Sequence, residues 1–103
     1  TPSAAAEAAD AVAFLEWLTG PQRGTGQPID RPIVPVSGAG NQVAVISRRR
    51  SGYFVTHLEG LAFPLVNGES IGLVSHPLAD GDLIELSGTM LRFRLRTPGP
   101  FDE

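Results

Sequence analysis

Cysteine and lysine are both absent from this chain of 103 residues. Without thiols the chain has no disulfide, no thiolate nucleophile and no cysteine-based metal site, which fits a reducing, cytoplasmic compartment. All eight basic residues are therefore arginine, a bias that GC-rich codon usage explains better than a selection for forked guanidinium donors. No apolar run approaches the roughly 18 residues of a membrane span, and the acidic residues within positions 4–18 argue against a signal peptide.

Other absences narrow the function. The net charge of −3 is too mild to indicate general nucleic-acid binding. No Gly-Lys-Ser/Thr follows the glycine-rich stretches, as a phosphate loop requires, and no serine lies in a Gly-x-Ser-x-Gly elbow. His57 and His76 lack a second histidine or a carboxylate at metal-ligand spacing, while Asp80 and Asp82 flank Gly81 as in a tight turn. We therefore expect no enzymatic activity, no catalytic residue, no metal, no cofactor and no small-molecule substrate.

With 42% apolar residues the chain is expected to be globular. Residues 1–19 are predicted to form an N-terminal α-helix that Gly20-Pro21 ends. The apolar side chains that recur there at helical spacing are Ala11, Phe14, Leu15 and Leu18. Because this stripe is narrow, the helix is expected to pack on its own domain or on a partner, and the sequence leaves both alternatives open.

Residues 20–96 are predicted to form an antiparallel β-sandwich. Residues 20–42 are rich in glycine and proline, so they are expected to contribute only edge strands, at Ile29 and at 33–36. Beyond them, short apolar strands alternate with turns at the spacing typical of a sandwich. The expected strands are 43–46, 53–58, 65–66, 71–74, 83–86 and 90–95, with turns at Asn67-Gly68, Asp80-Gly81-Asp82 and Ser87-Gly88-Thr89. Residues 97–103 are expected to be a linker-like tail of a fragment or of one domain of a longer protein.

The order of these turns and strands resembles a forkhead-associated (FHA) domain over roughly the last 50 residues. The matching positions are Tyr53, Val55, Leu58, Val66-Asn67-Gly68, Leu78, Asp80-Gly81-Asp82, Ile84, Leu91 and Phe93. The resemblance implies an FHA-like antiparallel β-sandwich preceded by a helix, and a module that recognises a partner. Because these are turn and core positions, they point to a fold and not to a ligand.

The phosphothreonine site of the family is only partly represented. Families of this type bind the dianion with a Gly-Arg, a Ser-Arg-x-His and a Ser-x-Asn-Gly-Thr loop. In this chain Gly60 stands in place of the loop serine and Ala62 in place of its asparagine, and neither offers a side-chain donor. His57 stands where the family usually has aspartate, and Arg31 is the candidate for the Gly-Arg arginine.

The Ser-Arg-x-His segment has two possible counterparts. One is Ser47-Arg48-Arg49-Arg50. The other makes Val43–Ile46 the equivalent strand, so that Gly40-Asn41 replaces Ser-Arg, and we favour this one because it leaves a strand before the turn at 48–51. Both remain open at this point. The candidate phosphopeptide- or partner-binding residues are Arg31, Ser47, Arg48, Arg49 and Arg50.

The sequence therefore predicts a protein–protein interaction module: an FHA-like domain with a degenerate phosphothreonine site, acting as a scaffold or assembly element of a larger bacterial protein. The alternative is a signalling domain that binds phosphothreonine peptides through the five candidate residues. A third class, a binder of nucleic acid or another polyanion, would need the arginines at 48–50 and those at 92–96 to form one basic patch.

Overall fold

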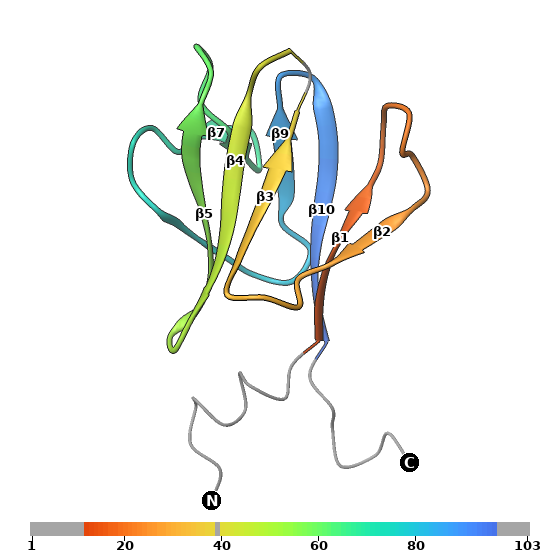
Figure 1. Ribbon diagram of the computed structural model, residues 1–103, viewed down its shortest axis with the longest axis vertical. Coiled ribbons are helices and arrows are strands. Elements are labelled where there is room, and N and C mark those ends of the chain that lie inside the picture. The colour runs from red at the N-terminus through yellow and green to blue at the C-terminus, as the bar shows by residue number, and fades with distance from the viewer. Residues whose placement is uncertain (1–11, 39, 97–103) are drawn as a thin grey trace, which may run out of the picture.

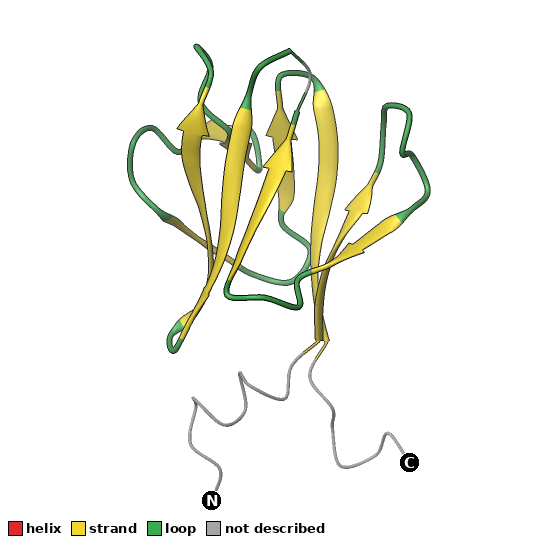
Figure 2. Ribbon diagram, viewed as in Figure 1, coloured by secondary structure: helices red, strands yellow, loops and turns green. Residues whose placement is uncertain are grey.

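The computed structural model describes residues 12–38 and 40–96, and within them it contains strands and no helix (Figure 2). Every strand pairing is antiparallel. The strands are β1 (Val12–Trp17), β2 (Gly26–Pro28), β3 (Ile33–Ser37), β4 (Val43–Arg49), β5 (Gly52–Glu59), β6 (Leu65–Val66), β7 (Glu69–Ser70), β8 (His76–Leu78), β9 (Leu83–Leu86) and β10 (Thr89–Arg96).

The strands form two facing sheets (Figure 1). The larger sheet has the order β2-β1-β10-β9-β6-β7, and the smaller has the order β3-β4-β5-β8. The all-β prediction with two antiparallel sheets is thus confirmed for the described residues. Long hairpins build the centre of each sheet, β4 with β5 in the smaller and β9 with β10 in the larger.

The core lies between the sheets and follows the period of two expected for strands with one buried face. Leu91 and Phe93 of β10 are completely buried, while Arg92 and Arg94, which alternate with them, are not. The ring of Tyr53 on β5 crosses the gap to Phe93, with 5.5 Å between centroids. The apolar residues of β10 therefore face the core while its arginines alternate with them on the other side of the strand.

The predicted N-terminal helix is wrong where the structure can test it. Residues 12–17 form β1, which pairs with β10 along its whole length, and residues 1–11 lie outside the described residues. Ala13, Leu15 and Trp17 are buried, whereas Phe14 and Glu16 are half-buried, so the burial pattern has period two. In so short a segment the apolar residues fit either period, Leu15 belongs to both patterns, and pairing with the edge of β10 decides for the strand.

The proline-rich segment is confined to sheet edges, as predicted, but the strand expected at Ile29 lies at Gly26–Pro28 instead, and Ile29 follows it as a buried loop residue. The segment supplies β2 and β3, and each is the edge strand of its sheet. Pro35 lies within β3, where an edge position tolerates the missing N–H.

The predicted strand at residues 71–74 is also wrong. Ile71 alone is buried, Leu73 and Val74 are 79% and 66% exposed, and Gly72 has a φ of +65°. This segment is the connection that leaves β7 in one sheet and reaches β8 in the other, so its backbone has no neighbouring strand with which to pair. The predicted turns at Asn67-Gly68 and at residues 80–82 are confirmed.

The described residues contain no helix with the length and apolar character needed to cross a membrane.

Candidate functional site

Three connections meet at the upper end of the sandwich in Figure 1: the β3–β4 loop, the β5–β6 loop and the β9–β10 turn. Together they surround an open hollow of about 680 Å³, which we call the apical hollow. Its described lining residues are Gly40, Asn41, Gln42, Glu59, Gly60, Leu61, Ala62 and Ser87. Loops held at one end of a rigid sandwich are a common place for recognition sites.

Gln42 ties the three connections together. Its side chain is only 2% exposed. Nε2 of Gln42 donates to the carbonyl oxygen of Ala62 at 3.0 Å, and Oε1 accepts a hydrogen bond from the Ser87 hydroxyl. The backbone carbonyl of Gln42 accepts from the N–H of Gly38 at 2.9 Å. Because a buried amide is destabilising unless its donor and acceptor are paired, these bonds fix the loops around the hollow.

Glycines let these loops approach so closely. A Cβ atom on Gly60 would lie 2.9 Å from Cα of Gln42, and Gly60 has a φ of +113° that other residues rarely adopt. A Cβ atom on Gly38 would lie 2.5 Å from Cβ of Leu86. At Gly38 and Gly60 there is therefore no room for a side chain, and one placed there would push the neighbouring segments apart.

The rim beside the hollow is apolar. Leu61 is fully exposed at the tip of the β5–β6 loop, and Phe63 is 38% exposed. The Phe63 ring packs edge-on against the His57 ring, with 4.8 Å between centroids and 76° between planes. His57, at the position where the FHA resemblance would place aspartate, thus helps to hold the loop that presents Leu61.

The electrostatic character of the hollow is neutral to acidic. Glu59 is the one ionisable side chain among its described lining residues. A phosphate dianion would meet no guanidinium there and would be repelled by the Glu59 carboxylate. The arrangement suits an apolar side chain, a backbone segment that can bond to Asn41, or a basic group placed near Glu59.

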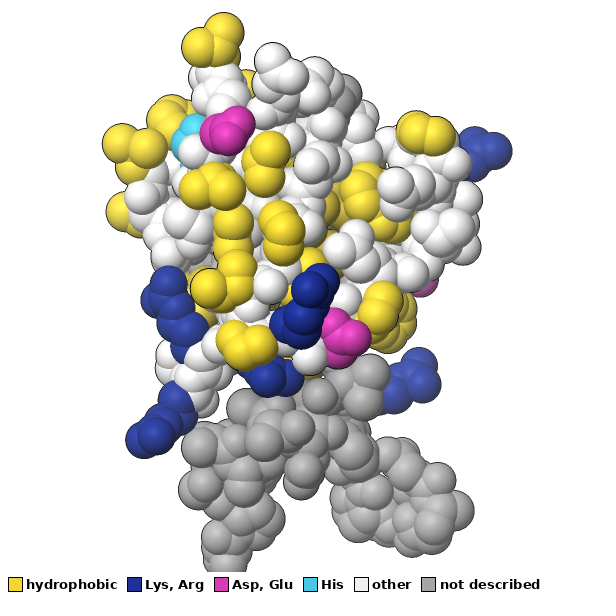
Figure 3. Space-filling model, in the orientation of Figure 1, with side chains coloured by type: hydrophobic (Ala, Val, Ile, Leu, Met, Phe, Trp, Pro, Cys, Tyr) yellow, Lys and Arg dark blue, Asp and Glu magenta, His cyan; other side chains and the backbone are white. Residues whose placement is uncertain are grey.

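The residues predicted to bind a phosphopeptide or a partner lie at the other end of the sandwich. Arg31 precedes β3, while Ser47, Arg48, Arg49 and Arg50 lie at the end of β4 and in its turn to β5. The sheet register brings these residues near one another, but the length of β4 and β5 separates them from the apical hollow. We call Arg31 and Arg48–Arg50 the arginine end; Figure 3 shows the basic side chains concentrated toward that end.

The contacts of the arginine end are few and exposed. Arg31 approaches Asp30 at 3.8 Å, with both side chains 70% exposed. Arg49 Nη2 donates to Ser75 Oγ at 3.2 Å, and its guanidinium lies 4.6 Å from the centroid of the Phe54 ring. Exposed pairs of this kind contribute little to stability, so these guanidinium groups remain accessible to an anionic partner. The Ser47 hydroxyl is buried and has no hydrogen-bond partner among the described residues.

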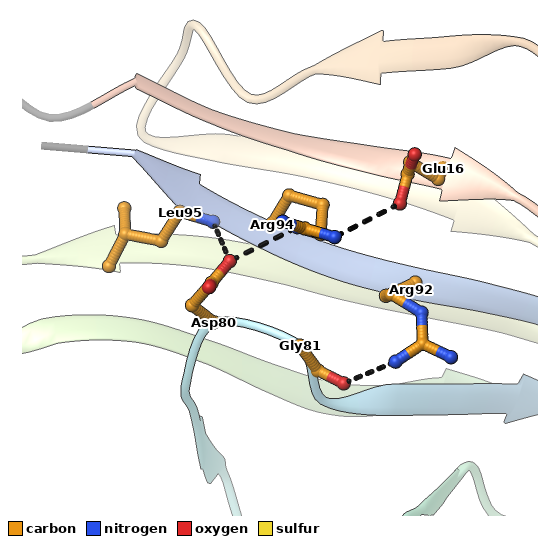
Figure 4. A network of polar contacts seen from close by, with 6 residues as sticks. All are labelled: Glu16, Asp80, Gly81, Arg92, Arg94 and Leu95. Atoms are coloured by element: carbon orange, nitrogen blue, oxygen red, sulfur yellow. Dashed lines mark hydrogen bonds and ion pairs between the residues drawn. The ribbon is translucent and has the colours of Figure 1, made fainter.

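The arginines of β10 belong to a different surface. Arg94 lies between Asp80 and Glu16, at 3.2 Å and 3.8 Å, and Arg92 donates to the carbonyl oxygen of Gly81 at 3.0 Å (Figure 4). They lie on the outer face of the larger sheet, whereas the β4–β5 turn belongs to the smaller sheet. A polyanion binder would need the arginines at 48–50 and those of β10 to form one basic patch. Arg92 and Arg94 do not join such a patch.

Sequence reasoning named the β5–β6 loop and Gly40-Asn41 but missed Gln42 and Ser87. A glutamine at the junction of a loop and a strand belongs to no hydrophobic pattern that would reveal its burial. Ser87 fits a turn, and the sequence gives no sign of its hydrogen bond to Gln42. Among the described residues, no group of three or more His, Asp or Glu side chains could hold a metal ion.

Comparison with models of known protein families finds no matching family, and comparison with curated proteins finds no significant relative.

Proposed function

We propose that this chain is a protein–protein interaction module of the FHA-like type, which binds its partner at the apical hollow without requiring a phosphate. Acting this way it would serve as a scaffold or assembly element. The observation that carries the proposal is the charge of the hollow: its described lining contains Glu59 and no arginine.

The FHA-like assignment draws support from the positions of the matching residues. Asn67-Gly68 forms the turn between β6 and β7, and residues 80–82 form the turn before β9. The loop at Gly60–Ala62 lines the hollow together with Gly40-Asn41, as expected if Gly40-Asn41 stands at the Ser-Arg position of the family. If Ser47–Arg50 were the counterpart of the Ser-Arg-x-His segment, it would have to lie beside Gly60. The two segments lie at opposite ends of β4 and β5.

The ligand follows from the chemistry of the hollow and its rim. Leu61, which lines the hollow, is fully exposed, and Phe63 in the same loop is 38% exposed. Glu59 favours a cationic group nearby, and Asn41 offers an amide that can bond to a peptide backbone. We expect a peptide segment with an aliphatic or aromatic anchor followed by arginine or lysine, because a few anchor residues supply most of the affinity of an interface.

The experiment is a selection from two peptide libraries that are identical except that one carries phosphothreonine and the other threonine. Selected peptides are then titrated into ¹⁵N-labelled chain. We expect equal enrichment in both libraries, apolar-basic consensus sequences, and shifts of the amides at 40–42 and 59–62. Enrichment that depends on the phosphate, shifts at the arginine end only, or no enriched peptide in either library would overturn the proposal.

A matched pair of variants sharpens the result. Leu61→Gln removes the most exposed apolar side chain of the rim, and we expect it to weaken the selected peptides about tenfold, as a moderate hot-spot residue does. Leu73→Gln makes the same change at a residue that is 79% exposed in the β7–β8 connection, outside the hollow. It should leave peptide affinity unchanged.

A second candidate function is favoured by one observation, the concentration of Arg31 and Arg48–Arg50 at the arginine end. A phosphothreonine or another anionic group could be bound there by guanidinium groups. The same titration separates the two candidates, because this one predicts phosphate-dependent shifts at residues 31 and 48–50 that weaken steeply with added salt.

A further inference from the structure

The outer face of the smaller sheet is unusually apolar. Antiparallel sandwiches normally turn polar side chains outward on the face away from the core. Here the strand positions that alternate with the core residues are mainly apolar or small. We call the following residues the apolar face: Ile33, Pro35, Val43, Val45, Phe54 and Leu58.

Exposure of this face is substantial. Ile33 and Leu58 are 62% and 59% exposed, and Pro35 is exposed as well. Val43, Val45 and Phe54 are half-buried, and the Arg49 guanidinium lies 4.6 Å from the centroid of the Phe54 ring. Figure 3 shows several hydrophobic side chains gathered over the smaller sheet. Contiguous exposed apolar surface of this kind marks an interaction site.

Opposite charges flank the apolar face along the strand direction. Arg49 pairs with Gly52 where β4 and β5 begin their tight turn, and Glu59 pairs with Val43 where the same two strands end. Along β4, Arg49 and Val43 are each three residues from Ile46, so the two pairs lie about 10 Å on either side of Ile46. The face is therefore positive at one end and negative at the other, about a centre near Ile46.

This pattern is self-complementary under one symmetry. If a second copy stacks face to face with its strands antiparallel, about a two-fold axis in the interface plane near Ile46, each Arg49 lies over the partner's Glu59. If the strands are parallel, Arg49 meets Arg49 and Glu59 meets Glu59, which is repulsive. We propose that the apolar face is an isologous dimer interface, in which a second copy of this chain packs antiparallel and its Glu59 pairs with Arg49.

The size of the face predicts a weak dimer. The three strands that carry the face, spaced about 4.8 Å apart and roughly 20 Å long, present on the order of 300 Å² per copy. A stable interface buries roughly 800 Å² per partner. We therefore expect a dissociation constant on the order of 100 µM, so the chain should be monomeric in dilute solution and dimeric when concentrated or tethered at high local concentration.

The first test is sedimentation equilibrium of the full chain between about 10 µM and about 1 mM, a range that brackets the expected dissociation constant. We expect a reversible monomer–dimer equilibrium, with amide shifts of Val43, Val45 and Thr56 that change with concentration. A chain that remains monomeric at the highest concentration overturns the proposal, and so do concentration-dependent shifts confined to another surface.

The second test concerns orientation. Arg49→Glu and Glu59→Arg should each weaken the dimer about tenfold, because each places like charges together. The double variant should return the dissociation constant to within about threefold of the original, since the exchanged pairs attract again. A double variant that is weaker than either single variant overturns the antiparallel arrangement.

The third test concerns the apolar contact. Ile33→Gln changes an exposed residue, so it should leave the fold intact while weakening the dimer about tenfold, as loss of an interface anchor does. Leu73→Gln is the matched control outside the face and should have no effect. Circular dichroism spectra that match the unmodified chain establish that each variant is folded. An undiminished dimer in Ile33→Gln would exclude this face as the interface.

Discussion

The Asn67 side chain joins the β6–β7 turn to the turn that precedes β9. Its Nδ2 donates to Oδ1 of Asp82 at 3.1 Å, and its Oδ1 accepts from the N–H of Leu83 at 3.0 Å. The other carboxylate oxygen of Asp82 accepts from the N–H of Ala79 at 2.8 Å. Two turns that are 15 residues apart in the sequence are thus held by one amide–carboxylate pair.

Asn67 also adopts a left-handed backbone conformation, with a φ of +52°. We expect Asn67→Ala to lower the free energy of unfolding by about 2 kcal/mol, because it removes these hydrogen bonds and adds left-handed strain. Asn67→Gly removes the same bonds without adding strain, so this variant should lower the free energy of unfolding by about 1 kcal/mol. Urea denaturation followed by tryptophan fluorescence measures both. Equal losses in the two variants would contradict the role given to the backbone.

A pair of glycines isolates the close approach at the apical hollow. Gly60 and Gly68 both have positive φ, but a Cβ on Gly60 would lie 2.9 Å from Cα of Gln42, whereas a Cβ on Gly68 would have no atom within 4 Å. We expect Gly68→Ala to lower the free energy of unfolding by about 1 kcal/mol, from backbone strain alone. Gly60→Ala should lower it by about 2–4 kcal/mol, because overpacking against Gln42 adds to the backbone strain. Thermal unfolding compares them. If Gly60→Ala were as stable as Gly68→Ala, the loops around the hollow could separate without any loss of stability.

The buried Gln42 gives a prediction about coupling. Gln42→Leu leaves the Ala62 carbonyl and the Ser87 hydroxyl unpaired, and we expect a loss of about 2–4 kcal/mol. Ser87→Ala alone should be milder, at about 1 kcal/mol, because it leaves only the Gln42 oxygen without a partner. In a double-mutant cycle measured by denaturation, the two changes should couple by about 1 kcal/mol. Purely additive losses would mean that the two side chains do not depend on each other.

The strand assignment of residues 12–17 can be tested by mutation. Leu15 is 1% exposed, whereas its neighbour Phe14 is half-buried. In the predicted helix both residues would have belonged to one apolar stripe, and their alanine variants would have lost similar amounts of stability. In a strand they lie on opposite faces, so Leu15→Ala should cost about 3 kcal/mol and Phe14→Ala clearly less. The ratio of the two losses in chemical denaturation decides between the assignments.

Much of the second half of the fold was predictable because its signals are local. The Asn67-Gly68 turn and the Ser87-Gly88 turn combine residues that accept positive φ with flanking apolar strands, and both turns are present. The alternation in 91–95 fixed which face is buried. The connection at 71–74 misled the prediction because Ile, Leu and Val in a loop look like a strand until the neighbouring backbone is known.

The candidate site was less accessible to prediction. The sequence left open how Arg31 lies relative to Arg48–Arg50, and the pairing of β3 with β4 brings these segments to one end of the sandwich. Their distance from the Gly60 loop follows only from the register of β4 with β5. Gln42 gave no signal, because the reason for its burial lies in Ala62 and Ser87, residues 20 and 45 positions away.

By itself the sequence determined the all-β class, the positions of most turns and the absence of thiol chemistry, because turn residues and period-two patterns act over a few neighbours. Tertiary structure alone decided that residues 12–17 are a strand, that the arginines and the apical hollow occupy opposite ends, and that the smaller sheet exposes an apolar face. Each of these depends on which strands become neighbours, and that choice is made by the packing of the whole core.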